Sequence, residues 1–147
     1  MKTLISSTPH ILLIDDNRDG VLVRRSLLEE IGCCVQIASN GEEGLKLFKA
    51  TAFDVVVTDY RMPSMNGAEL IQRIRMLDPN ARIILLSGFV EPLGLTEQNT
   101  GADAVITKSA NEPAYLVRWV KRLVNRAMRK PPGSQKAPKS SLKATGR

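Results

Sequence analysis

Four short apolar segments of this 147-residue chain each run into a residue that could do chemistry. Clustered carboxylates can hold a divalent cation such as Mg²⁺ through hard oxygen ligands, and a carboxylate can also attack phosphorus as a nucleophile. A nearby ammonium or hydroxyl group can then stabilise negative charge on the oxygens bound to that phosphorus. The residues are Asp15 and Asp16 after segment 10–14, Asp59 after 55–58, Ser87 after 82–86 and Lys108 after 104–107.

The four segments have the composition of strands in a parallel sheet. The run from Val55 to Thr58 is apolar or β-branched without alternation, which is typical of a strand covered on both faces. In such sheets ligands bind at the carboxyl ends of strands, where Asp59 would lie. Taken singly, Asp59 could be a turn or cap residue, Ser87 a turn hydroxyl and Lys108 a surface ion-pair partner. Their shared position at strand ends favours a common site.

Helical patterns separate the strands. A polar turn at 16–20 precedes a helix that we expect to end near Ile31, with Val23, Leu27, Leu28 and Ile31 inward and Arg24 and Arg25 between them. Strand 34–38 precedes a capping box at Ser39–Glu42, which predicts a second helix to about residue 51.

Two further helices and one weak helix complete the pattern. Asn66–Glu69 repeats the capping signal and predicts a third helix to about residue 77. A last helix is expected over 112–128, with Leu116, Trp119, Val120 and Leu123 toward the core. The interval from residue 88 to 101 should hold the weak helix. Pro92 and Gly94 disfavour a regular helix there, so we expect a short or frayed one over about 92–99.

The order of an acid pair, an aspartate, a serine and a lysine on successive strand ends resembles the receiver domain of two-component response regulators. The resemblance implies an α/β, flavodoxin-like (βα)5 fold, a doubly wound parallel five-stranded sheet with strand order 2-1-3-4-5, over residues 8–128. That order puts the first and third strands side by side. Asp15, Asp16 and Asp59 would then meet.

The resemblance also implies roles for these residues. Asp59 would accept a phosphoryl group from a sensor histidine kinase or phosphotransfer protein, and Lys108 and Ser87 would contact the transferred oxygens. Mg²⁺ would be held by the carboxylates of Asp16 and Asp59 and the backbone carbonyl of Arg61, with Asp15 in an outer contact. Such a protein is a phosphoryl acceptor and not an enzyme, and it switches contacts with an unknown downstream protein.

Three features depart from the family pattern: the residues at two positions, and the irregular fourth helix expected over about 92–99. Ser109 stands where the family usually has a proline after the lysine, and Val105 stands where it often has a switching aromatic residue. The resemblance therefore predicts an intact chemical site with an altered output surface, read mainly through Ser87 and the loop at 88–94.

Two other function classes fit the same elements. One is an adaptor with this fold that works without phosphorylation. The other is an α/β phosphohydrolase, which we disfavour because the chain has Arg61, and no second aspartate, two residues after Asp59 and offers no cap domain.

The remaining composition limits location and redox chemistry. No apolar run approaches the roughly 20 residues that span a bilayer, and residues 1–7 are too short and polar for a signal peptide, so we expect a cytoplasmic chain without a membrane partner. Cys33 and Cys34 are adjacent, which disfavours a normal disulfide between them.

The formal charge of +6 is concentrated at the carboxyl end. Residues 126–147 hold seven lysines and arginines and no acidic residue. Residues 129–147 lack apolar periodicity, so we expect a basic, flexible tail or linker. Such a tail could add affinity for an acidic partner, including nucleic acid. We favour the linker because the tail has no recognition helix and no interleaved aromatic residue.

Overall fold

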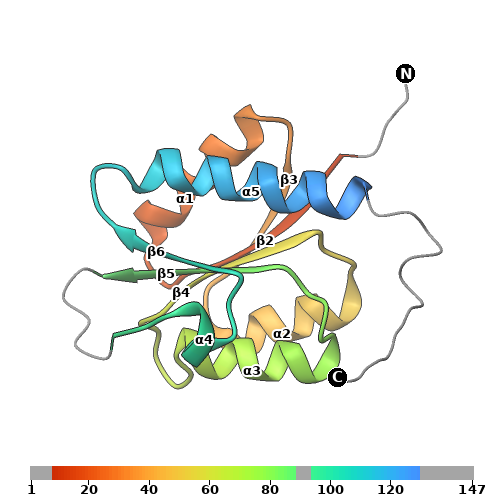
Figure 1. The fold of residues 1–147 in the computed structure, drawn as a ribbon. Helices are drawn as coiled ribbons and strands as arrows, with labels where there is room; N and C mark the ends of the chain where they lie inside the picture. Colours follow the sequence, from red (N-terminus) through yellow and green to blue (C-terminus); the bar gives the residue numbers. More distant parts are fainter. Residues whose placement is uncertain (1–7, 89–93, 130–147) are drawn as a thin grey trace.

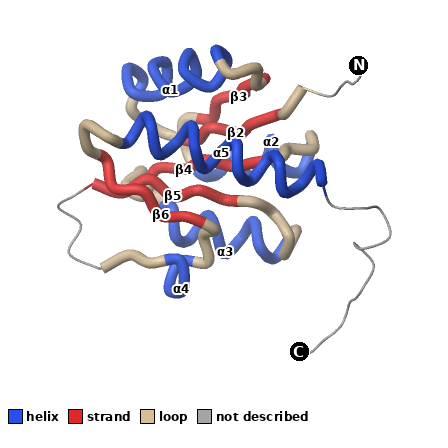
Figure 2. Tube along the Cα trace, turned by 45° about the horizontal axis from the view of Figure 1, so that its top comes forward, coloured by secondary structure: helices blue, strands red, loops and turns tan. Residues whose placement is uncertain are grey.

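The computed structural model describes residues 8–88 and 94–129 as a sheet of parallel strands between two layers of helices (Figure 1). α1 and α5 cover one face and α2 and α3 the other; the same layers are seen from a second direction in Figure 2. In chain order the elements are β2 (His10–Ile14), α1 (Arg18–Glu30), β3 (Cys34–Ala38), α2 (Gly41–Ala50), β4 (Val55–Asp59), α3 (Gly67–Leu77), β5 (Ile83–Gly88), α4 (Glu97–Thr100), β6 (Ala104–Lys108) and α5 (Glu112–Arg129).

The strand order is β3-β2-β4-β5-β6, which is the predicted order 2-1-3-4-5. All four neighbouring pairs are parallel. In register, Ile14 lies beside Thr58, Asp59 beside Leu86, and Ser87 beside Thr107. The expected flavodoxin-like α/β fold is therefore confirmed, and every strand ends at the same edge of the sheet.

The core has two halves because successive strand residues point to opposite faces. On the α1 and α5 side, Leu13 and Val57 pack with Leu116. On the α2 and α3 side, Leu12 and Val56 pack with helix residues such as Ile71. This double burial explains the unbroken apolar runs of the central strands.

The first helix begins earlier than predicted. The Asn17 side chain accepts a hydrogen bond from the backbone N–H of Gly20 at 3.0 Å, so α1 starts at Arg18 and includes Gly20. The expected inner face is wrong at Val23, whose side chain is 65% exposed. Arg24, predicted to stand between the core positions, is instead turned inward, with 11% of its side chain exposed.

The capping prediction holds for α3 and is shifted by one residue for α2. At α3, Asn66 and Glu69 form the reciprocal capping box. At α2 the cap is Asn40, which accepts from the N–H of Glu43 at 2.8 Å. Glu43 in turn accepts from the N–H and hydroxyl of Ser39, so the box pairs different residues from those expected.

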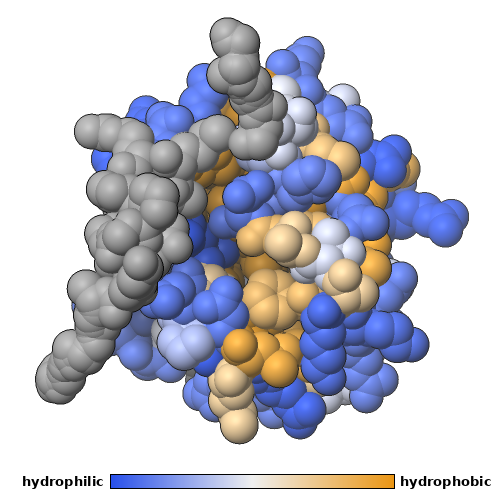
Figure 3. All heavy atoms as spheres, turned by 90° about the vertical axis from the view of Figure 1, so that its right-hand side faces the viewer, coloured by the Kyte–Doolittle hydropathy of each residue, from blue (hydrophilic) through white to orange (hydrophobic). Residues whose placement is uncertain are grey.

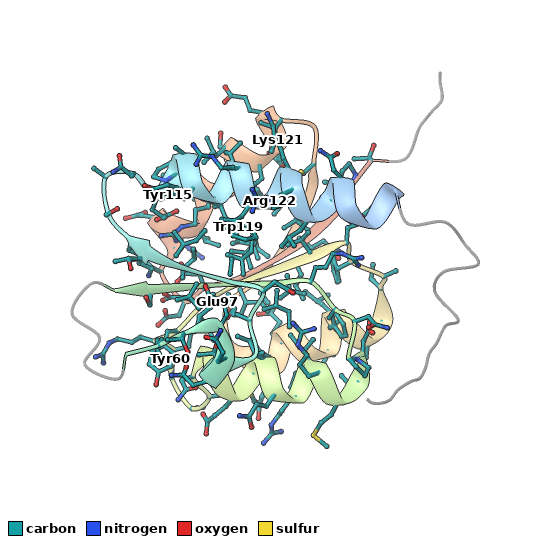
Figure 4. All side chains as sticks on the ribbon, viewed as in Figure 1. Tyr60, Glu97, Tyr115, Trp119, Lys121 and Arg122 are labelled. Atoms are coloured by element: carbon teal, nitrogen blue, oxygen red, sulfur yellow. The ribbon has the colours of Figure 1, made fainter. Side chains whose placement is uncertain are left out.

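The weak helix is shorter than expected. α4 covers only Glu97–Thr100 because Thr96 caps it and Gly101 ends it in a left-handed conformation. Residues 92 and 93 of the predicted helix lie outside the described residues. So does most of the loop at 88–94, through which we expected phosphorylation to be read. Glu97 accepts a hydrogen bond from the N–H of Val105 at 3.0 Å, which ties α4 to the edge strand β6 (Figure 4).

The last helix follows its predicted stripe. Leu116, Val120 and Leu123 are buried, and Trp119 is partly buried against the same cluster (Figure 4). The Arg122 guanidinium lies 4.9 Å from the centre of the Trp119 ring. The predicted tail at 129–147 lies, apart from residue 129, outside the described residues.

Figure 3 views the end of the molecule where the strands begin, and hydrophobic side chains gather there among hydrophilic ones. The predicted site residues belong to the other end. None of the helices in the described ranges is long and apolar enough to cross a membrane.

Candidate functional site

The carboxyl ends of β2, β4, β5 and β6 bring the predicted residues to one edge of the sheet. β4 lies between β2 and β5, so Asp59 has the acid pair on one side and Ser87 on the other. Lys108 lies beside Gly88, at the end of the next strand. The predicted grouping of these strand ends is thus present in the structure.

Asp15, Asp16 and Asp59 form an acidic cluster. One carboxylate oxygen from each residue lies within 4.8 Å of the others. Asp15 and Asp59 are only 2% and 5% exposed, whereas Asp16 is open to solvent. Two of the three carboxylates therefore depend on partners in the protein, or on a bound ion, for compensation.

Lys108 supplies part of that compensation. Its Nζ lies 2.6 Å from Oδ1 of Asp59, although 30% of the lysine side chain is exposed. Burial nevertheless raises the pKa of Asp59, because the charged form loses hydration; the hydrogen bond from Lys108 acts in the opposite direction, and the charge of Asp15 adds to the rise. Burial is thus the largest influence on this carboxyl, and the contact with Lys108 offsets it only in part.

An open pocket beside the cluster brings Asp16 and Arg61 together. Its lining is Asp16, Tyr60, Arg61, Met62, Pro63 and Asn66. Tyr60, labelled in Figure 4, is mostly buried and follows Asp59 directly. The pocket gives solvent and small ligands access to the exposed side of the cluster.

The loop after Asp59 is held by a close backbone contact. The N–H of Gly67 donates to the carbonyl of Tyr60 at 2.7 Å. A Cβ at residue 67 would lie 2.5 Å from the carbonyl oxygen of Asp59 and 3.0 Å from Cα of Tyr60. Only glycine fits there, so the start of α3 fixes the backbone of the central site residue.

The segment after Lys108 has ordinary backbone geometry. Every peptide bond in the described ranges is trans, including the one that joins Lys108 to Ser109. The chain then turns into α5, whose first residue is Glu112. Lys108 reaches Asp59 with serine in the position where a proline is usual in the family.

Two charged residues at the site were not predicted. Arg24 donates from one Nη to Asp15 at 2.8 Å, and from Nε and its other Nη to the two carboxylate oxygens of Glu112, at 3.2 and 3.0 Å. Glu112 is 6% exposed. The position of Arg24 among the apolar residues Val21 and Leu28, at helical spacing, is the signal that could have indicated it.

The donor set fits a hard divalent cation. Three carboxylates are close enough to share one ion, and one of them faces solvent. Oxygen ligands with room for water are the surroundings that Mg²⁺ prefers. Asp16, Asp59 and the backbone carbonyl of Arg61 are the residues that would hold it, with Asp15 behind them.

Comparison with known sequences gives one family. Residues 11–120 match the model of the response regulator receiver domain. A response regulator receiver protein of Anaeromyxobacter sp. is 39% identical over 106 residues, which are 71% of this chain and 44% of that protein. The virulence sensor protein BvgS of Bordetella bronchiseptica is 32% identical over 144 residues, which are 92% of this chain and 12% of BvgS. The chain thus spans less than half the length of either relative.

Solved structures agree with the sequence match. A CheY-like receiver domain of Methanospirillum hungatei is 29% identical with a TM-score of 0.75, over 83% of this chain and 98% of that one. The response regulator TrrA of Thermotoga maritima, in complex with Mg²⁺ and BeF, is 33% identical with a TM-score of 0.71, over 79% of this chain and 99% of that one. On the family match, the fold and these likenesses, the chain belongs to the response regulator receiver domain family of two-component systems.

Proposed function

We propose that this receiver domain accepts a phosphoryl group on Asp59 from a phosphohistidine of a sensor histidine kinase or phosphotransfer protein. The observation that carries the proposal is the buried Asp59 carboxylate, flanked by two further carboxylates and contacted by Lys108 at 2.6 Å. By this proposal the chain is a phosphoryl acceptor in the cytoplasm, not an enzyme with its own substrate. It signals through changed contacts with a downstream protein.

The transfer exchanges one bond to phosphorus for another. An oxygen of the Asp59 carboxylate forms a bond to phosphorus while the bond from phosphorus to the imidazole nitrogen breaks, and that nitrogen keeps the electron pair. The product on this chain is an acyl phosphate. Burial favours the step because a partly desolvated carboxylate is a better nucleophile than a hydrated one.

Neighbouring residues stabilise the charge that moves onto the phosphoryl oxygens. Lys108 can shift from the carboxylate oxygen to a phosphoryl oxygen over a short distance, because its Nζ already lies at the site. Ser87 is 6% exposed at the end of the adjacent strand, and its hydroxyl can donate to a second phosphoryl oxygen. Mg²⁺ held by Asp16, Asp59 and the backbone carbonyl of Arg61 would neutralise part of the charge on the phosphoryl oxygens.

The test is mass spectrometry after incubation with acetyl phosphate and Mg²⁺. The wild type should gain one phosphoryl mass, Asp59→Asn should gain none, and EDTA should abolish the gain. Asp19→Asn is the matched control because Asp19 is an exposed carboxylate on the neighbouring helix α1. A gain that persists in Asp59→Asn overturns the assignment. A wild type that is never labelled supports the adaptor that works without phosphorylation.

A further inference from the structure

Arg24 connects two parts of the molecule that the proposed chemistry treats separately. Its guanidinium contacts Asp15 in the acidic cluster and, with two donors, Glu112 at the first turn of α5. The three side chains are 11%, 1% and 8% exposed. Buried charges with this geometry are held much more strongly in place than a surface pair.

These contacts and the chain between Lys108 and Glu112 connect the acidic cluster to the start of α5. Asp59 is bound to Lys108, and Lys108 leads in four residues to Glu112. Glu112 is bound to Arg24, and Arg24 to Asp15, which directly follows β2, the strand next to β4. A change at the acidic cluster can therefore reach the start of α5 by two routes, through Lys108 and through Arg24.

The surrounding residues leave room for the guanidinium and hold its partner. A Cβ at Gly20, one turn earlier on α1, would lie 3.1 Å from an Nη of Arg24. Glycine at this position therefore leaves space for the guanidinium. Asp15 is also fixed independently, because its Oδ1 accepts from the N–H of Asn17 at 2.9 Å.

The charges show that Arg24 remains a cation there. Burial acts to lower the pKa of Arg24, but the hydrogen bond and charge of Glu112, with the charges of Asp15 and Asp59, outweigh burial and raise that pKa. One permanent positive charge is thus shared between the cluster and α5. A shift of the guanidinium toward Glu112 would lengthen its contact with Asp15, and the reverse shift would lengthen its contact with Glu112.

We propose that Arg24 is a positioning residue that sets the affinity of the acidic cluster for a divalent cation and couples occupancy of the cluster to the start of α5. The inference rests on the metal role proposed above. A cation bound at the cluster competes with the Arg24 charge at Asp15. The guanidinium then shifts toward Glu112, and the segment that joins Lys108 to α5 responds.

The first measurement is Mg²⁺ affinity by calorimetry on the full chain. Arg24→Met removes a positive charge beside Asp15, so Mg²⁺ should bind about tenfold more tightly. Asp15 should stay in place in this variant because the N–H of Asn17 still donates to it. Glu112→Gln removes one of the two carboxylates that Arg24 contacts, so its charge acts mainly on Asp15 and Mg²⁺ binding should weaken about threefold. In the Arg24→Met background the same Glu112 substitution should lose most of its effect, because the residue that links it to the cluster is gone.

The second measurement is hydrogen exchange of residues 109–116 with and without Mg²⁺. Mg²⁺ should change exchange in this segment of the wild type and change it clearly less in Arg24→Met and Glu112→Gln at saturation, because only the route through Lys108 remains in these variants. Arg24→Lys keeps the charge but lacks the planar fork that reaches both carboxylates. It should bind Mg²⁺ within about twofold of the wild type and still show the weaker response in 109–116.

Arg25→Met is the matched control, because Arg25 is on the same helix and its pair with Glu29 is long, at 3.9 Å, and exposed. If Arg24→Met unfolds the chain, Arg24→Lys and Glu112→Gln carry the test. The inference is overturned if the variants at Arg24 and Glu112 have the same Mg²⁺ affinity and the same hydrogen exchange in 109–116 as Arg25→Met. The metal site is unaffected by that outcome. A wild type that shows no saturable Mg²⁺ binding overturns the metal site and this inference together.

Discussion

At the scale of single residues, the pKa of Asp59 is the property with the clearest measurable consequence. Burial raises it, so the folded state holds a proton on this carboxyl more tightly than the unfolded state does. The stability that protonation supplies is fully present below the unfolded-state pKa. It is lost as the pH rises through the folded-state pKa.

Without Mg²⁺, Asp59→Asn should therefore be more stable than the wild type at neutral pH, because asparagine carries no buried charge. The advantage should shrink as the pH falls from about 7 and vanish below about 4, where the wild-type carboxyl is protonated in both states. Urea unfolding in EDTA across this range measures it. A variant that is less stable at neutral pH, with a difference that does not depend on pH, would contradict the direction given for this pKa.

The residues that carry chemistry were predictable, and those that support them were not. Asp15, Asp16, Asp59, Ser87 and Lys108 each follow a strand, and strand ends in a parallel sheet must meet at one edge. Arg24 was missed because Val21, Leu22, Val23, Leu27 and Leu28 allow two helix faces, and the true one depends on where the helix starts. Its partner Glu112 is 88 residues away, so no local pattern reveals the pair.

At the scale of elements, helix starts set the geometry of the site. α3 begins against the backbone of Asp59 and Tyr60, where a Cβ at Gly67 would meet main-chain atoms that cannot move aside. Gly67→Ala should cost about 2–3 kcal/mol of unfolding free energy, as overpacking in a tight core does. It should also reduce labelling by acetyl phosphate, because the Asp59 backbone must shift.

Gly41→Ala is the matched control, since the three atoms nearest to a Cβ there all belong to the side chain of Met65, with its sulfur closest at 2.8 Å. A flexible methionine can adapt, so the cost should be about 1 kcal/mol or less. Denaturant unfolding of both variants gives the comparison. Equal losses would mean that backbone contact at Gly67 is not special.

The N-cap of α2 could be Ser39, as predicted from the sequence, or Asn40, as the structure has it. Asn40 accepts from the N–H of Glu43, so Asn40→Ala should cost about 1 kcal/mol. Ser39→Ala removes only an exposed hydroxyl bond to Glu43 and should cost less than about 0.5 kcal/mol. The reverse ranking in thermal or urea unfolding would restore Ser39 as the cap. Sequence alone could not rank them, because both residue types are good caps one position apart.

At the scale of the whole molecule, a metal ion that binds only the folded state should stabilise it. Mg²⁺ at 100 times its dissociation constant should add about 2.7 kcal/mol to the free energy of unfolding. Asp16→Asn should lose most of this increment at the same Mg²⁺ concentration, because Asp16 is the exposed member of the cluster and a predicted ligand. Melting curves in Mg²⁺ and in EDTA measure both effects, and an equal increment in Asp16→Asn would exclude it as a ligand.

The basic tail should be dispensable for the site. Removing residues 130–147 should leave Mg²⁺-dependent labelling unchanged, because every site residue lies between 15 and 112. If the tail binds nucleic acid, the affinity should fall steeply with salt, with a log–log slope near −0.9 for each phosphate neutralised. A mobility-shift titration at two salt concentrations, with and without the tail, decides. Binding that is absent, or that survives removal of the tail, supports the linker.

The strand order determines when, during folding, the chain becomes able to accept a phosphoryl group. The site takes residues from four strands that are adjacent in space but separated by whole helices in sequence, and the last, Lys108, comes from the edge strand β6. Such parallel pairings between distant segments form late and together. A chain with only β2 and β4 assembled would have the acidic cluster without its lysine. Phosphoryl labelling should therefore count completely folded molecules, and in partial denaturant the labelled fraction should track the cooperative unfolding curve.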